Sequence, residues 1–360
     1  MTLDSPFALA RFRDNGTGSD QSDTSSTGPN TTVGAVTGSV AGQEPATLGL
    51  VVDDFIRALS TADLGAANLN EFLADPDWDR LAALAAEASA DAGQLWRPLD
   101  SVTLTAPVEP RQVLQAGANY RDHVIELVAS GLSTNTDMSL EAARDQAATM
   151  MDARAANGEP YIFIGLPSCV VGDDEALQLP TSSDTHDWEL ELAAVIGKPA
   201  FRVSREEALD HVAGFTICND ISTREFTFRK DMKEIGSDWL KSKNSPGFLP
   251  TGPFLVPNRF VDPADLDVRL ELNGEVKQDA NTSDLMFDLA ALLSTASQTA
   301  QLLPGDLLLT GSPAGNGQHW KRFLHDGDVL TGSISGLGTQ TIRCVGESKA
   351  AAATREGARA

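Results

Sequence analysis

The chain has 360 residues, of which 41% are hydrophobic and 22% are charged, and its formal net charge is -24. This composition is typical of a globular protein with one large or two ordinary domains, and it argues against a fibrous or wholly disordered chain. Because the acidic excess repels phosphate backbones and anionic lipids, we expect neither nucleic acid nor a membrane as a partner. Three scattered cysteines, no signal-peptide-like segment and no apolar stretch of membrane-spanning length predict a soluble, cytoplasmic protein.

Residues 1–105 are predicted to form a small, β-rich N-terminal domain. Two short patterned runs at 7–12 and 48–56 have the character of strands, and an alanine-rich helical pattern covers 77–92. Residues 16–43 lie between the two runs and consist mainly of Gly, Ser, Thr, Asp and Asn. Such a segment cannot bury enough apolar surface to offset its ordering entropy, so we expect a disordered loop.

Residues 106–346 are predicted to form a larger, mostly β domain. Short runs that alternate or are continuously apolar, punctuated by Gly, Pro, Asn and Asp, indicate a rolled or barrel-like sheet. Helical spacing predicts helices over 139–156 and 283–302, and the first of them falls in a segment, 130–160, that could act as a lid. The tail at 347–360 is expected to be flexible. The predicted fold class is therefore α+β, with β structure predominating.

Two carboxylates stand two residues apart in the strand-like run HDWELELAAVIGK. A period of two points Glu189 and Glu191 to one face, where they repel each other unless solvent or a cation separates them. Asp220 ends another apolar run, AGFTICND, where a carboxylate is less easily explained as solvated surface. Three oxygen ligands suit Mg²⁺, Mn²⁺ or Ca²⁺ better than zinc. The alternative, which the pair alone favours in so acidic a chain, is an exposed strand edge.

Three further segments carry groups that are able to act in catalysis. His123 and Glu126 would share a face of a helix and could together activate water, and a surface His–Glu pair is the alternative. Lys243 precedes a Pro/Gly-rich loop and could hold a carboxylate or an enolate near a metal, whereas a surface lysine is the default. Thr310 opens the turn TGSPAGNG, whose backbone N–H groups could bind an oxyanion, although many strand-to-turn junctions look similar.

Taken in order, a series of motifs resembles those of the fumarylacetoacetate hydrolase (FAH) family over about residues 111–345. They are NYRDH, the ExE of WELEL, ND, a lysine before FLPTGP, NGEVKQDANTSDLMFD, LLPGDLLLTGSPAGNG, and FLHDGDV followed by GLGTQ. A weaker likeness covers ARFRD and GLVVDD, which resemble the family's small first domain. The resemblance implies an FAH-like mixed β-roll in the larger domain, a divalent metal that is most often Mg²⁺, and a homodimer.

The same resemblance implies a role for each position that matches a family motif. These positions are Glu189, Glu191 and Asp220 for the metal, His123 and Glu126 for a water-activating dyad, Lys243 for catalysis, and Arg224 and Thr310 for the substrate. The implied activity is hydrolysis of a C–C bond in a small 2-oxo acid, such as an acylpyruvate or fumarylacetoacetate, through an enolate held by the metal. Enolate chemistry also serves hydration, decarboxylation and isomerisation of 2-oxo diacids. A non-catalytic ligand-binding protein on the same scaffold is a third interpretation.

Overall fold

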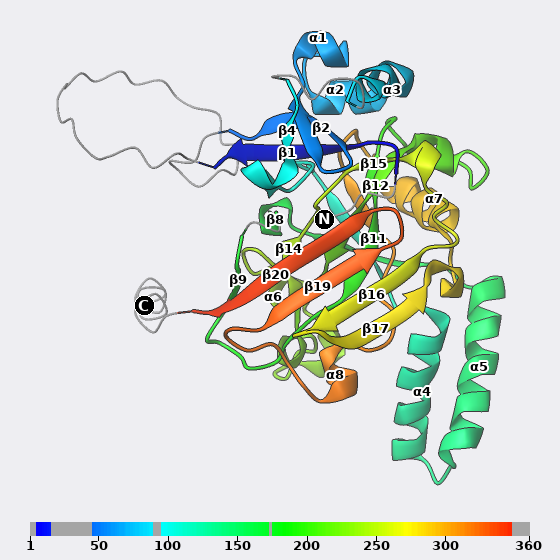
Figure 1. The fold of residues 1–360 in the computed structure, drawn as a ribbon. Coiled ribbons are helices and arrows are strands. Elements are labelled where there is room, and N and C mark those ends of the chain that lie inside the picture. The colour runs from blue at the N-terminus through cyan, green and yellow to red at the C-terminus, as the bar shows by residue number, and fades with distance from the viewer. Residues whose placement is uncertain (1–4, 16–44, 89–94, 173–174, 348–360) are drawn as a thin grey trace, which may run out of the picture.

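A computed structural model describes residues 5–15, 45–88, 95–172 and 175–347. Three sheets of five or six strands and a projecting pair of helices dominate the fold, which Figure 1 colours from blue at the N-terminus to red near the C-terminus. The loop predicted at 16–43 lies outside the described residues, as does the predicted tail after residue 347. Within the described ranges, no helix combines the length and apolar character needed to cross a membrane.

The first sheet is antiparallel and has the strand order β4-β3-β2-β1-β5. Its strands are β1 (Ala8–Asp14), β2 (Thr47–Val52), β3 (Phe55–Ala58), β4 (Arg97–Pro98) and β5 (Val102–Thr105). The run 48–56, predicted as one strand, is divided between β2 and β3. Asp53 turns the chain there with a φ of 49°, a left-handed conformation that Asp tolerates better than most residues.

Three short helices pack beside this sheet, above it in Figure 1. They are α1 (Thr61–Leu64), α2 (Leu69–Ala74) and α3 (Trp78–Ala86). Ser60, Asn68 and Asp77 cap their N-termini, each by accepting a hydrogen bond from a backbone N–H of the first turn. The helix predicted over 77–92 is thus present but ends at Ala86, and residues 89–92 lie outside the described chain.

The second sheet has six strands in the order β15-β12-β11-β18-β6-β7 and lies at the centre of the larger part. Its strands are β6 (Val113–Gly117), β7 (Tyr161–Gly165), β11 (Leu190–Ile196), β12 (Val212–Asn219), β15 (Val256–Pro257) and β18 (Leu307–Leu309). Every residue of β11 and β12 is buried, which accounts for their largely apolar sequences. The two strands pair antiparallel with Leu190 opposite Asn219, so the start of β11 lies beside the end of β12.

The third sheet packs against the second and has the order β17-β16-β19-β20-β9. Its strands are β9 (Leu177–Leu179), β16 (Asp267–Leu272), β17 (Glu275–Asn281), β19 (Val329–Ile334) and β20 (Gly338–Gly346). The contact is close because Gly332 has no side chain: a Cβ there would stand 2.5 Å from Leu190. Two short pairs complete the strands, β8 (Val170–Val171) with β14 (Leu249–Pro250) and β10 (His186–Asp187) with β13 (Ser222–Thr223).

Five helices accompany these sheets. They are α4 (Arg121–Asn135), α5 (Leu140–Asn157), α6 (Trp239–Lys243), α7 (Leu289–Thr299) and α8 (Gly317–Trp320). The prediction of α5 over 139–156 is accurate to one residue, because Ser139 is its N-cap. The prediction of α7 over 283–302 began too early: residues 282–284 form a 3₁₀ turn, and the helix starts after the Asp288 cap.

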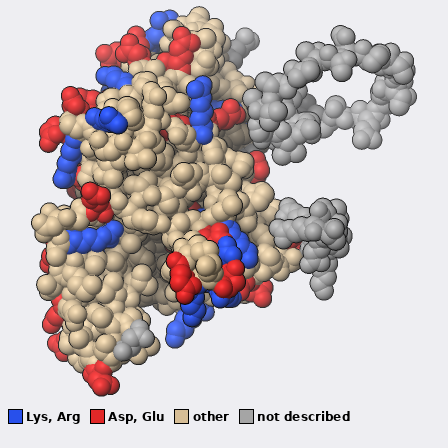
Figure 2. Space-filling model, turned by 180° about the vertical axis from the view of Figure 1, so that it is seen from behind, with Lys and Arg blue, Asp and Glu red and all other residues tan. Residues whose placement is uncertain are grey.

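Helices α4 and α5 form the hairpin that projects at the lower right of Figure 1. They pack through a small cluster built on Ala129, Ala143 and Ala147, which are fully buried. The segment 130–160, predicted as a lid, consists of the end of α4 and all of α5, and its closure over a site stays a prediction. On the face shown in Figure 2, Lys and Arg side chains stand among Asp and Glu rather than in one continuous basic area.

Candidate active site

Three carboxylates converge where β11 begins and β12 ends. Glu189 immediately precedes β11, Glu191 is its second residue, and Asp220 follows the last residue of β12. The antiparallel register brings them together, and the Asp220 N–H donates to the Glu189 carbonyl at 2.8 Å. One carboxylate oxygen from each residue lies within 4.8 Å of the others. Glu191 and Asp220 are 2% and 1% exposed, so neither belongs to a solvated strand edge.

Two cations lie against this cluster, a buried lysine and a half-buried arginine. The Lys243 ammonium, at the end of α6, donates to Glu189 Oε2 and Ser222 Oγ at 2.7 Å each, and also to Asp220. Arg224 Nη2 is 2.6 Å from Glu189 Oε1. Lys243 is 4% exposed, which excludes the surface-lysine alternative. Glu189 is thus held from both sides.

The pKa values of the three carboxylates differ because the two cations do not contact them equally. Burial raises the pKa of Glu189, but the neighbouring Arg224 and Lys243 outweigh it and lower that pKa to about 2. Burial and the adjacent carboxylates hold the pKa of Glu191 well above its usual range. Burial also raises the pKa of Asp220, although Lys243 opposes the shift. Two of the three acids therefore lack sufficient neutralising charge.

A divalent cation fits this donor set. All the available donors are carboxylate oxygens, the ligands that Mg²⁺, Mn²⁺ and Ca²⁺ prefer. Asp220 Oδ1 is buried and accepts no hydrogen bond of normal geometry, although the Gln115 amide lies near this carboxylate, and such an oxygen is costly unless a ligand completes its environment. Glu191 Oε2 accepts the Gly311 N–H at 2.8 Å, which fixes the carboxylate from its far side. Glu189, Glu191 and Asp220 are the residues that could hold the ion.

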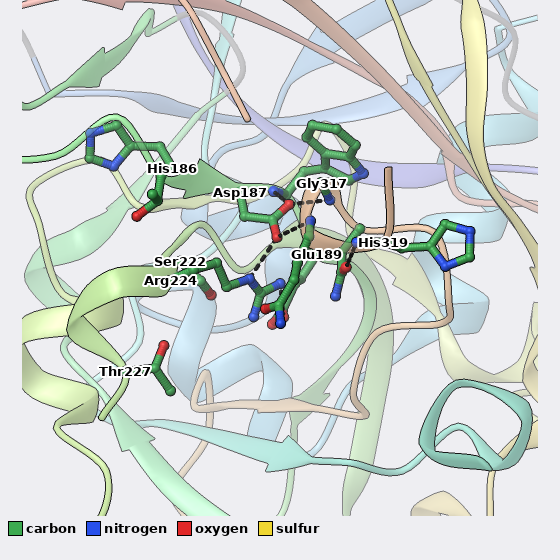
Figure 3. A network of polar contacts seen from close by, with 12 residues as sticks. His186, Asp187, Glu189, Ser222, Arg224, Thr227, Gly317 and His319 are labelled. Atoms are coloured by element: carbon green, nitrogen blue, oxygen red, sulfur yellow. Dashed lines mark hydrogen bonds and ion pairs between the residues drawn. The ribbon is translucent and has the colours of Figure 1, made fainter. Parts of the chain in front are cut away.

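A fourth buried carboxylate, Asp187, was not predicted as part of the site. It is fully buried and accepts hydrogen bonds from Arg224 Nε at 2.6 Å, from the backbone N–H of Trp188 and Gln318 at 2.8 and 3.1 Å, and from that of Gly317. Figure 3 shows Asp187 between Arg224 and Gly317. Asp187 therefore fixes both the arginine and the start of α8. The sequence contains a signal for it, because Asp187, Glu189 and Glu191 continue one alternation of period two.

The His123 and Glu126 side chains lie on α4, as their spacing predicts. His123 is half-buried, and burial lowers the pKa of its imidazole, with the charge of Glu189 opposing. Glu126 lies near two cationic or potentially cationic groups from other elements: Arg144 Nη2 at 3.5 Å and His319 Nδ1 at 3.6 Å. The helix hairpin and α8 thus meet at Glu126. His319 had no place in the predicted site.

The Thr310 side chain is turned into the sheet. Its hydroxyl donates to the Leu192 carbonyl at 3.1 Å, and the residue is fully buried. The next residue, Gly311, contributes instead through its backbone, because its N–H donates a hydrogen bond to Glu191. At this turn the structure joins the backbone, and not the threonine hydroxyl, to the acidic cluster.

The chain is similar in sequence to one protein family and to several of its members. Residues 112–345 match the family model described as "Fumarylacetoacetate (FAA) hydrolase C-terminal". The chain is 34% identical over 257 residues to the mitochondrial oxaloacetate tautomerase of Xenopus laevis, a match that covers 70% of this chain and 72% of that protein. It is 36% identical over 263 residues to the 2,4-didehydro-3-deoxy-L-rhamnonate hydrolase of Sphingomonas sp. strain SKA58, covering 72% and 82% of the two chains.

Solved structures extend the likeness beyond the residues that the family model matches. The fumarylacetoacetate hydrolase of Exiguobacterium antarcticum matches with a TM-score of 0.66 at 26% identity, covering 95% of this chain and 100% of that one. The maleylpyruvate hydrolase of Sphingobium sp. SYK-6 matches with a TM-score of 0.63 at 27% identity, covering 84% and 98%. Coverage of this extent includes the first sheet as well as the larger part.

Proposed function

Because the chain belongs to the fumarylacetoacetate hydrolase family, we propose that it is a metal-dependent hydrolase that cleaves a C–C bond in a small 2-oxo acid of the acylpyruvate or fumarylacetoacetate type. The observation that carries this proposal is the convergence of three carboxylates beside Lys243 and Arg224. An anionic substrate is repelled by a chain whose net charge is -24, so its recognition depends on positive charge concentrated at one place.

The proposed ion is Mg²⁺, with Mn²⁺ or Ca²⁺ as alternatives, held by Glu189, Glu191 and Asp220. When bound, it supplies Lewis-acid polarisation of the substrate's carbonyl oxygen. Lys243, whose ammonium is held by Glu189, Asp220 and Ser222, is proposed to stabilise through its positive charge the negative charge that develops on the keto oxygen. Arg224, oriented by Asp187, is proposed to bind the substrate carboxylate.

His123 is proposed as the general base. Its lowered pKa keeps the imidazole neutral near pH 7, so Nδ1 or Nε2 can accept a proton from water. The hydroxide adds to the carbonyl carbon remote from the 2-oxo acid group, and the C–C bond breaks with its electron pair passing to the 2-oxo acid fragment. That fragment takes up a proton, so an acylpyruvate gives a carboxylic acid and a smaller 2-oxo acid. Glu126, on the same helix, is proposed to stabilise the protonated His123, which its charge favours.

A tautomerase or isomerase is the second candidate, and two observations favour it. The Xenopus relative is by name an oxaloacetate tautomerase. Glu126 is also contacted by Arg144 and His319, so it is not reserved for His123. Tautomerisation requires a base that moves a proton between carbon and oxygen but no water attack. Hydration or decarboxylation of a 2-oxo diacid would use the same groups. The homodimer stays a proposal from the family resemblance, and the cytoplasmic location stays a proposal from the sequence features given above.

Metal titration and product analysis test the proposal. We expect Glu191→Gln to weaken Mn²⁺ or Mg²⁺ binding by ~10-fold or more in calorimetry, while the exposed Glu206→Gln, as a matched control, leaves it unchanged. Acylpyruvates, oxaloacetate and unsaturated 2-oxo diacids would then be incubated with the loaded enzyme. Product masses separate a cleaved C–C bond from added water, lost CO₂ or an unchanged mass. Equal metal affinity in the two variants would remove the proposed ligand set.

A further inference from the structure

Three aromatic side chains form a continuous surface beside the acidic cluster. Tyr161 and Phe163 come from β7, at the edge of the second sheet, and Trp239 is the first residue of α6. The Phe163 and Trp239 rings stack at a centroid distance of 4.9 Å and an angle of 20°, and Tyr161 stacks on Phe163 at 5.9 Å. The Trp239 indole N–H donates to the Tyr161 hydroxyl at 2.6 Å. We call these three residues the aromatic wall.

The wall reaches the cluster at one end and the base of α4 at the other. Lys243 Nζ, which binds Glu189 and Asp220, lies 5.6 Å from the Phe163 centroid and 5.7 Å from that of Trp239. At the other end the Tyr161 ring packs on Gly117, where an added Cβ would stand 2.8 Å from it. Gly117 ends β6 and leads into the helix that carries His123. The wall therefore extends from the proposed metal site to the end of the strand that precedes the helix of the proposed base.

The wall is open to a ligand, in contrast to the buried cluster. Tyr161 is 44% exposed, and Phe163 and Trp239 are half-buried, whereas Lys243 is 4% exposed. Half-exposed stacked rings beside buried charged groups leave flat apolar surface uncovered. A planar ligand group would bind such a surface most favourably, because two flat apolar faces can stack and bury each other's surface from water.

The charges on the two elements favour a neutral partner. Strand β7 contains no cation, and α6 contains two, Lys241 and Lys243. Lys243 is committed to the carboxylates, and the Lys241 ammonium lies 4.1 Å from the centre of the Phe226 ring. The residue before Trp239 is acidic, Asp238, which caps α6 and lies 3.6 Å from Arg229, a cation that also pairs with Asp231. A second carboxylate on the substrate would therefore meet no uncommitted cation on these two elements.

We propose that the aromatic wall binds the tail of the substrate and that this tail is neutral and planar, an aryl or conjugated group rather than a second carboxylate. The inference rests on the proposed function, because it assumes that the 2-oxo acid head lies at the cluster. Trp239, Phe163 and Tyr161 are then the residues that determine specificity.

A matched pair of stable ligands tests the proposal without turnover. 2-Oxo-4-phenylbutanoate and 2-oxoglutarate share one head and spacer and differ only in a terminal phenyl group or carboxylate. In calorimetry with Mn²⁺, we expect the phenyl compound to bind roughly 3- to 10-fold more tightly to the unaltered protein. Trp239→Leu should reduce this preference to less than about twofold with 2-oxoglutarate affinity unchanged, and Leu240→Ala, at an exposed position of the same helix, should keep it.

Phe163→Leu provides a second variant should Trp239→Leu fail to fold. Tighter or equal binding of 2-oxoglutarate to the unaltered protein would overturn the proposal, as would a phenyl preference that survives both substitutions. Failure of the proposed function gives a different result: no acylpyruvate is converted, yet the phenyl preference and its loss in Trp239→Leu remain. Conversion of acylpyruvates without any phenyl preference would overturn this inference alone.

Discussion

Replacement of Asp187 by Asn should destabilise the fold and the candidate site together. Asn preserves the shape of the side chain and one acceptor oxygen, which can still serve Trp188 and Gly317. Its amide group would then stand against Arg224 Nε and the Gln318 N–H, both of which are donors. The substitution thus removes the hydrogen bonds from the Arg224 cation and from the uncharged Gln318 N–H, and it leaves Arg224 with Glu189 as its remaining acidic partner.

The expected loss of unfolding free energy is about 3 kcal/mol. A charged hydrogen bond contributes ~1.5–3 kcal/mol, and breaking a buried ion pair costs ~3–5 kcal/mol. The lower part of that range applies because Glu189 still neutralises Arg224 at 2.6 Å. Since Arg224 loses the group that orients it, we also expect kcat/KM for a 2-oxo acid to fall by ~10-fold or more.

Asp306 offers a closely matched control. It is also fully buried, and it accepts four hydrogen bonds, from the backbone N–H of Arg111, Gln112 and Leu303 and from the Gln112 amide. None of these donors is a cation. Asp306→Asn should therefore cost only ~1–2 kcal/mol in urea-induced unfolding and leave kcat/KM unchanged. Equal losses of stability and activity in the two variants would refute the view that the ion pair with Arg224 causes the larger effect of Asp187→Asn.

Two further predictions concern the groups on α4. His319→Gln removes an imidazole 3.6 Å from Glu126, and because both side chains are well exposed we expect kcat to fall only ~2- to 5-fold, with an effect that vanishes in a Glu126→Gln background. Additive effects in that double-mutant cycle would show that the contact does not matter. Burial lowers the pKa of His123, so its neutral form persists below the usual value of about 6.5 and the acid limb of kcat/KM should lie below that pH. An acid limb above pH ~6.5 would assign the base to another group. The lowered pKa also means that the unfolded chain binds a proton at His123 more readily than the folded protein does. The contribution of this histidine to the free energy of unfolding is therefore present above pH ~6.5 and is lost as pH falls toward the folded-state pKa.

The family, the fold class and the strands that hold the carboxylates could be predicted from sequence. The runs of β11 and β12 are apolar except at Glu191, Thr216 and Asn219. This pattern is typical of strands in a sheet that is covered on both faces. The match over residues 112–345 confirms the resemblance, and the solved relatives confirm a mixed fold with an N-terminal antiparallel sheet. Once the two strands pair, the acids at their adjacent ends must approach each other.

What could not be predicted depends on side-chain direction and on partners far along the chain. The role of Asp187 requires backbone N–H groups 130 residues away, at Gly317 and Gln318, which no local pattern indicates. The orientation of Thr310 is similar, since its hydroxyl could serve a ligand or the sheet, and the choice depends on the register of β11 and β18. The start of α7 was misplaced because Leu285 and Phe287 continue a helical pattern, whereas the Asp288 cap fixes the true start.

The charges within the buried site give an independent reason for a divalent ion. Glu189, Glu191, Asp220 and Asp187 can carry four negative charges, and Lys243 and Arg224 carry two positive ones. Buried charges are costly unless neutralised, and burial accordingly raises the pKa values of Glu191, Asp220 and Asp187, the last despite its contact with Arg224. A structural ion-pair network would have matched its charges, as the single charges of Arg322 and Asp328 do elsewhere in the described chain. A deficit of two positive charges over these four carboxylates, three of which converge, is what a site for a doubly charged cation requires. Protonation of two acids is the alternative that such a cation would displace.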